Sequence, residues 1–330
     1  MKYLFIILGI LICPNLNAQI ENYLIYQKGI NQAELNLIRG KKAESLNNYY
    51  SILTTSKGNF CKDIYNALLL SSELSKTDTF FVLLDLLIPK GLENSYINSH
   101  FKKFHKYSQW DLFLTKNKVQ PNIKHELKAK IDSLGVIDQK FRIKKGSYKI
   151  YEDTIRIIDS LNMDYIFELI ASNQFPGERD IGVNNFAGRQ GYDIVFHHYT
   201  QSTSLDKNKY KITPLLVNLV LQGKLLPNKA SHWLEMQNGE FTAGVFDVLC
   251  FDVNGKETAH FVPKYDKRKK VIINEYRKWL GMESLDEYYE KFRFQINNPK
   301  SNYIFDLQRN ILTVNDEVFK KFTSNMIELR

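Results

Sequence analysis

Residues 22–38, NYLIYQKGINQAELNLI, decide the fold class of this chain. Apolar residues recur there at helical spacing, and Gly40 follows as a stop signal. Three more stretches of the same kind follow, beginning near residues 43, 64 and 80. Because each predicted helix has one apolar side, each must pack against a neighbour. The pattern therefore predicts paired helices over residues 19–120.

The positions of Gly40 and Ala43, and the Tyr65-Asn66-Ala67 start of the third helix, resemble those of tetratricopeptide repeats. The large aromatic residue that usually opens such a repeat is missing. The resemblance covers residues 19–118 and implies a scaffold that binds a peptide or protein partner, or packs against the C-terminal domain. A plain helical bundle is the alternative.

The N-terminus has the layout of a secretory signal peptide. Met1-Lys2 is basic, Tyr3–Ile12 is almost entirely apolar, and a small residue, Ala18, closes the segment. We therefore expect residues 1–18 to be a cleaved signal peptide, and the protein to be periplasmic or extracellular. Lipidation at Cys13 is less favoured, because Ile12 occupies the position where a lipobox has a small residue. No second apolar run is long enough to predict a transmembrane segment after cleavage.

Composition limits the class of protein further. A length of 330 residues suggests about two domains, and only 16 Gly and 8 Pro favour long helices over a many-stranded sandwich. The net charge of +9 is spread along the chain, which argues against nucleic-acid binding. Two denser basic clusters occur at Lys140–Lys149 and Lys264–Lys270. They could contact anionic lipid or polysaccharide, but a solvated helix face and loop are favoured.

The rest of the chain predicts an α-rich domain over residues 121–296 and an extension over 297–330. One β-hairpin is expected at 245–262, because Asn254-Gly255 separates two β-rich runs. A two-residue turn there would pair Phe251 with Thr258. The expected fold class is thus mainly α, with a helical-repeat-like N-terminal domain and an α-rich domain that contains one hairpin.

A series of short motifs in residues 138–292 resembles a family of unknown function that is common in exported bacterial proteins. The motifs appear in order, each with the structural context that the family shows. They are Asp138-Gln139-Lys140-Phe141-Arg142, the pair Asp159 and Asn162, Pro176 with Gly182, His197-His198, and Arg277 with Leu280-Gly281-Met282 and Tyr288. The resemblance implies a fold unit and a candidate site, but no particular reaction.

The chain departs from this family at two places. Leu234-Glu235-Met236 stands where the family usually has an Asp-Arg pair, and Phe241-Thr242-Ala243-Gly244 replaces a Q-x-Y-G-T segment. If those segments carry catalytic or ligand groups in the family, this chain has lost them.

His198 is the first candidate for chemistry, because it matches the family histidine and its side chain titrates near neutral pH. Adjacent helical residues point about 100° apart, so His197 would face elsewhere. A buried histidine satisfied by one hydrogen bond is the structural alternative. Arg142 is a candidate to bind a carboxylate or phosphate. At i, i+4 from Asp138 it equally fits an intrahelical ion pair.

His232 and Glu235 lie at i and i+3, a spacing that could support metal binding or acid–base chemistry together with His198. A helix-surface pair is favoured, so no metal site and no cofactor are predicted. Asp138 and Gln139 are candidate binding residues. So are Glu178 and Arg179, which we expect to be exposed on a glycine-rich loop beside the histidine helix. Cys61 and Cys250 are expected to be buried free thiols rather than a disulfide.

Two functions are consistent with these features. The first is a binding or interaction protein that docks a peptide or protein partner through residues 19–118. The alternative is a hydrolase-type enzyme that uses His198 as acid/base, assisted by Arg142, His232 or Glu235.

Overall fold

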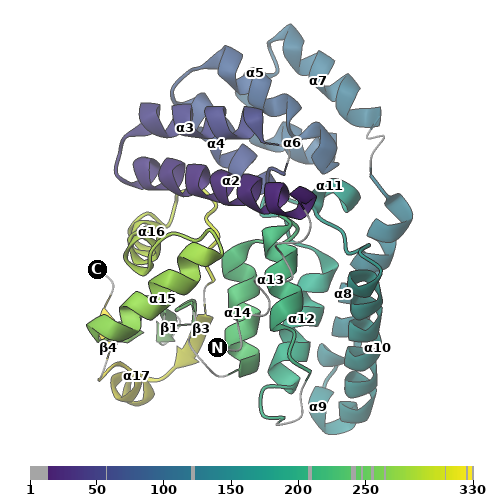
Figure 1. Ribbon diagram of the computed structural model, residues 1–330, viewed down its shortest axis with the longest axis vertical. Helices are drawn as coiled ribbons and strands as arrows, with labels where there is room; N and C mark the ends of the chain where they lie inside the picture. The colour runs from purple at the N-terminus through teal and green to yellow at the C-terminus, as the bar shows by residue number, and fades with distance from the viewer. Residues whose placement is uncertain are drawn as a thin grey trace. The chain divides into compact units, whose positions relative to one another are not determined.

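The computed structural model describes residues 14–56, 58–119, 123–206, 210–238, 243–246, 248–253, 256–263, 265–308, 310–324 and 326–328. These residues form a mainly helical protein with one small sheet, as expected (Figure 1). Residues 1–13, Pro121-Asn122 and Asn254-Gly255 lie outside the described part. Helix α2 (Pro14–Ile38) runs through Ala18, the expected cleavage position. In the part of the chain described, no helix is long and apolar enough to cross a bilayer.

The chain divides into two compact units at places other than the expected boundary near residue 120. One unit contains the residues up to Asn48 together with Tyr210–Arg330, and the other contains Tyr49–Lys209. We call them the terminal unit and the central unit. Helix α3 (Lys42–Thr55) crosses the first boundary. The segment 19–118, expected to be one repeat domain, is thus shared between both units.

The described residues of the central unit form helices and connecting loops, without a strand. Its helices are the second half of α3, α4 (Cys61–Glu73), α5 (Thr77–Asp85), η1 (Ile88–Lys90), α6 (Asn94–His100), η2 (Lys102–Phe104), α7 (Ser108–Val119), α8 (His125–Arg142), α9 (Ser147–Ile150), α10 (Glu152–Ala171), α11 (Glu178–Ile181) and α12 (Gly191–Ser202). Helix α10 is continuous through Asn162, whose buried side-chain amide donates to the Leu134 carbonyl of α8 at 3.5 Å.

The terminal unit combines helices with the sheet. Its elements are α2, α13 (Thr213–Leu221), α14 (Pro227–Asn238), β1 (Leu249–Val253), β2 (Lys256–Pro263), α15 (Lys267–Trp279), α16 (Leu285–Asn297), β3 (Asn310–Val314), α17 (Asp316–Thr323) and β4 (Met326–Glu328). The strand order is β3-β1-β2-β4. Residues 310–328 therefore supply both edge strands. Part of the segment 297–330, expected as an extension of the α-rich domain, thus belongs to the sheet.

The hairpin of β1 and β2 forms as predicted, but part of its register differs. Val253 pairs with Lys256 and Asp252 with Glu257, as a two-residue turn requires. A bulge follows, so Phe251 pairs with Ala259 rather than with Thr258. The extra residue in the bulged strand shifts every later pair by one.

Cys61 and Cys250 are both buried and form no disulfide with each other, as expected, and they belong to different units.

Candidate functional site

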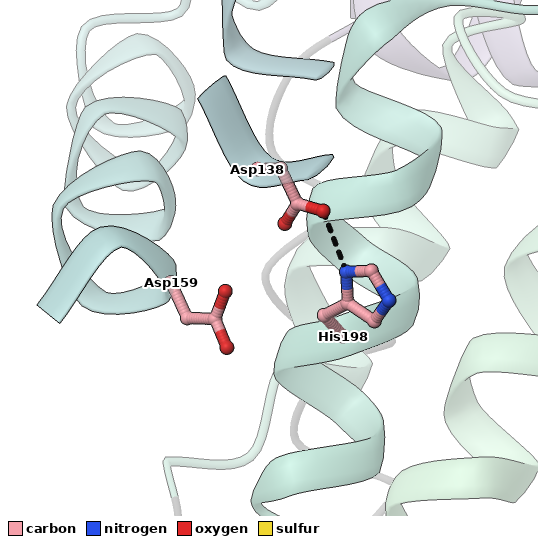
Figure 2. A group of neighbouring side chains, drawn as sticks. All are labelled: Asp138, Asp159 and His198. Atoms are coloured by element: carbon pink, nitrogen blue, oxygen red, sulfur yellow. Dashed lines mark hydrogen bonds and ion pairs between the residues drawn. The ribbon is translucent and has the colours of Figure 1, made fainter. Parts of the chain in front are cut away.

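The central unit brings four charged or titratable side chains together from three helices. Asp138 and Arg142 come from α8, Asp159 from α10 and His198 from α12. Figure 2 shows the Asp138 and Asp159 carboxylates turned toward His198 from two neighbouring helices. We call these four side chains the Asp–Arg–His cluster.

Close packing of α8 on α12 explains how the cluster is positioned. A Cβ atom added to Gly191 would lie 2.0 Å from the Ile131 carbonyl oxygen, so only glycine fits at that contact. Asp138 follows Ile131 by seven residues, and His198 follows Gly191 by the same interval. Seven residues make about two helical turns, which returns each side chain to the same helix face. The two helices therefore run in the same direction, and a glycine contact two turns upstream brings Asp138 and His198 together.

The Asp138–His198 contact is a short, partly buried hydrogen bond. His198 Nδ1 lies 2.8 Å from Asp138 Oδ2, and the Asp138 side chain is fully buried. A carboxylate only accepts hydrogen bonds, so Nδ1 carries the proton and Nε2 of a neutral His198 is an acceptor. Gln139 donates to the same Oδ2 at 2.7 Å. Within the described ranges, no residue hydrogen bonds to Nε2 of His198.

Arg142 neutralises both carboxylates of the cluster. Its Nη2 donates to the two Asp159 oxygens at 2.7 and 2.6 Å, and its Nη1 donates to the Asp138 backbone carbonyl at 2.8 Å. Nη1 also lies 3.2 Å from Asp138 Oδ1, an ion-pair contact without hydrogen-bond geometry. The predicted intrahelical pair is thus present. The guanidinium of Arg142 is bound to two aspartates of the protein itself, so it is not available to bind a ligand.

Burial and charge set the protonation of the neighbouring groups. Burial raises the pKa of Asp159 above its usual value, and the hydrogen bond from Arg142 partly offsets this rise. Burial lowers the pKa of His197, and His198 and Arg142 lower it further, although Asp138 acts in the opposite direction. The rings of His197 and His198 are in edge-to-face contact, with centroids 5.4 Å apart and planes at 71°. His197 is therefore a neutral neighbour of the cluster.

One nitrogen of His198 and one oxygen each of Asp138 and Asp159 lie within 4.8 Å of one another, close enough to share a cation. The guanidinium of Arg142 already contacts both carboxylates, and it supplies the positive charge that a metal ion would bring. The donor set fits a guanidinium better than a divalent ion, since a metal would have to displace Arg142 from two buried contacts.

Glu178 is buried, not exposed as expected. Its Oε2 accepts from the Cys61 backbone N–H at 2.7 Å and from the Lys90 ammonium at 3.0 Å. Lys90 also donates to the Asn59 carbonyl. Glu178 therefore fastens the glycine-rich loop to the start of α4. Arg179 is exposed beside it.

His232 and Glu235 belong to the terminal unit and have partners there. Glu235 accepts from the backbone N–H groups of Ala243 and Phe246 at 2.6 and 2.8 Å. The His232 ring stacks on Phe246, with centroids 4.5 Å apart. Contacts from His232 and Glu235 thus hold the segment that follows α14. Within the central unit it is Asp138 and Asp159 that surround His198.

Asp159 is the cluster member that the sequence-based choice of site residues omitted. It stands 17 residues from Arg142, so helical spacing could not connect them. Its place in the Asp159–Asn162 motif was the available signal.

Comparison of the chain with protein-family models, curated proteins and solved structures finds no match. The two resemblances seen in the sequence stay predictions, and the site is argued from its geometry alone.

Proposed function

We propose that the central unit is catalytic, with His198 as the general acid/base of a hydrolase-type reaction. The observation that supports this is the 2.8 Å hydrogen bond from His198 Nδ1 to the buried carboxylate of Asp138, which leaves Nε2 without a partner among the described residues. A carboxylate on Nδ1 fixes the tautomer in which Nε2 can accept a proton.

The chemistry follows from this arrangement. Nε2 of His198 takes a proton from water or a substrate hydroxyl as that oxygen attacks, and His198 becomes an imidazolium. The Asp138 carboxylate stabilises this cation through the Nδ1 proton. The same proton then passes from Nε2 to the leaving group, which restores neutral His198. Asp138 is thus a positioning residue. Arg142 and Asp159 hold it in place and do not touch the substrate.

Hydrolysis of model substrates tests the proposal. The full chain is assayed with p-nitrophenyl esters, phosphates and glycosides, and with a peptide anilide. We expect turnover in at least one class, and a fall of about 100-fold or more in kcat for His198→Gln. Asp138→Asn should also lower kcat, because the wrong tautomer is then stabilised.

The matched control is His125→Gln, which makes the same change at an exposed position in α8. It should retain the wild-type rate. Equal rates in wild type and His198→Gln, or no turnover with any of the substrates, would argue against an acid/base role.

Peptide or partner binding through residues 19–118, the leading expectation from the sequence, stays a prediction. Residues 19–48 and 49–118 belong to different compact units. Export through a signal peptide likewise stays a prediction, since residues 1–13 lie outside the described part of the chain.

A further inference from the structure

The connection between α8 and α10 forms an exposed tip with the sequence KFRIKKGSYKIY, residues 140–151. Gly146 adopts a left-handed conformation, with φ 78°, and reverses the chain before the short helix α9. Figure 1 shows α9 at one end of the α8–α10 pair. We call residues 140–151 the basic tip.

Large apolar side chains on the basic tip face solvent. Ile143 is 79% exposed, Ile150 is 67% exposed and Tyr148 is 57% exposed. Single exposed apolar residues are common on soluble proteins, whereas three such residues within eight positions offer apolar area that a partner could cover.

The same segment is strongly basic. Lys140, Lys144, Lys145 and Lys149 are all exposed, and residues 140–151 contain no acidic residue. Arg142, the remaining cation, is turned inward onto Asp159. The Lys144 ammonium lies 4.4 Å from the centroid of the Phe141 ring, which holds it beside the apolar side chains. The exposed charge of the basic tip is therefore uncompensated within the segment.

We propose that the basic tip binds the surface of an anionic phospholipid bilayer. Lysines beside a membrane attract anionic headgroups, and exposed isoleucine and tyrosine side chains enter the boundary between headgroups and acyl chains. An anionic polysaccharide would satisfy the lysines but would give Ile143 and Ile150 no apolar medium. The side chains proposed to contact lipid, the exposed lysines and isoleucines of the basic tip, do not belong to the Asp–Arg–His cluster, so the inference does not depend on the proposed function.

Vesicle flotation of the full chain tests the inference. We expect binding to vesicles of phosphatidylcholine and phosphatidylglycerol in equal parts, and none to pure phosphatidylcholine. Binding should fall in about 1 M salt, where the Debye length is about 3 Å. The triple variant Lys144→Gln, Lys145→Gln, Lys149→Gln should bind at least tenfold more weakly, because each lysine near an anionic surface contributes roughly fivefold. The double variant Ile143→Ser, Ile150→Ser should also bind more weakly.

Matched controls separate this surface from the overall positive charge. Lys102→Gln, Lys106→Gln, Lys118→Gln removes the same charge from exposed positions elsewhere in the central unit, and Val82→Ser, Leu112→Ser removes exposed apolar side chains. Both should bind as wild type does. Three results would overturn the proposal: equal loss in the lysine control, no binding to anionic vesicles, or retention on heparin resin that depends on Lys144, Lys145 and Lys149 without vesicle binding. The last result would assign the surface to polysaccharide.

Discussion

The carboxylate of Asp138 links α8 to two other helices. It contacts His198 of α12 directly, and it reaches α10 through Arg142, which binds Asp159. Its side chain is fully buried. Removing one member of a buried charged group leaves the others uncompensated, which costs about 3–5 kcal/mol. We therefore expect the network to stabilise the packing of α8, α10 and α12, whatever chemistry it performs.

Asp138→Asn tests this dependence. The substitution keeps the shape of the side chain but removes the charge opposite Arg142, so the free energy of unfolding should fall by about 3 kcal/mol. Urea unfolding followed by circular dichroism measures the change. The control is Asp153→Asn, whose partner Arg156 is exposed, and it should leave the midpoint unchanged. Equal midpoints for wild type and Asp138→Asn would mean that the network adds nothing to stability.

His197 predicts a pH dependence of stability. Burial lowers its pKa below the usual 6.5, so the unfolded chain binds more protons than the folded chain as pH falls through 6.5. Stability is therefore lost on acidification, and it is fully present above pH about 6.5. His197→Gln should reduce the loss in urea midpoint between pH about 7.5 and 5.5. Asp159, with its raised pKa, acts in the opposite sense. The informative quantity is therefore the difference in urea midpoint between wild type and His197→Gln. If this difference is the same at both pH values, the pH dependence does not come from His197.

At this scale the sequence predicted what lies within one helix. The i, i+4 spacing predicted the Asp138–Arg142 pair, and the motif position selected His198. It could not place Asp159 beside Arg142, because that contact depends on how α8 and α10 pack. Nor could it show that Glu178 is buried, since a charged residue on a glycine-rich loop has no pattern that predicts a buried lysine partner such as Lys90.

Among the elements, the contact of α8 with α12 decides whether the Asp–Arg–His cluster forms. Gly191→Ala would place a methyl group 2.0 Å from the Ile131 carbonyl oxygen and push the helices apart. Overpacking of this kind costs about 1–3 kcal/mol. We expect the urea midpoint to fall, and any activity that depends on His198 to fall with it.

Two other glycines provide the controls for this prediction. A Cβ atom at Gly135 would lie 3.4 Å from the Gly191 Cα atom, an ordinary contact, and a Cβ atom at Gly58 would meet nothing within 4 Å. Gly135→Ala and Gly58→Ala should be neutral or slightly stabilising. If Gly191→Ala is as stable as either control, the close approach does not position the helices.

The sequence identified most helices and the hairpin, because apolar periodicity and the Asn-Gly turn are local signals. It missed strands β3 and β4. These strands are short, and β3 pairs in parallel with β1, more than fifty residues earlier in the chain. No local pattern encodes such a partner. The sequence also did not predict the one-residue register shift between β1 and β2, because the position of a bulge depends on how the strands pack.

For the whole molecule, helix α2 folds together with residues from the second half of the chain in the terminal unit. Lys291 of α16 forms a buried ion pair with Glu34 of α2, and also contacts Glu283 at 3.3 Å. Asn31 of α2 donates to the Gly281 carbonyl at 3.0 Å. Helix α2 is therefore fixed by residues more than 240 positions away. The apolar stripe of residues 22–38 did not reveal this, because it predicts that a helix packs but not its partner.

Lys291→Met tests this arrangement against a contiguous N-terminal repeat domain. The variant removes the buried cation that contacts both Glu34 and Glu283, although Glu283 keeps its contact with Arg277, and should cost about 3 kcal/mol. Arg39→Met breaks a second ion pair to α16, Arg39–Glu290, whose arginine directly follows α2. This pair is partly exposed, and its loss should cost less than about 1 kcal/mol. Hydrogen exchange measured by mass spectrometry should show α2 and α16 losing protection together in Lys291→Met. The helices α8, α10 and α12 should keep theirs, since they belong to the central unit. Loss of protection in α2 together with α4 and α5, while α16 stays protected, would instead mean that residues 19–118 fold as one domain.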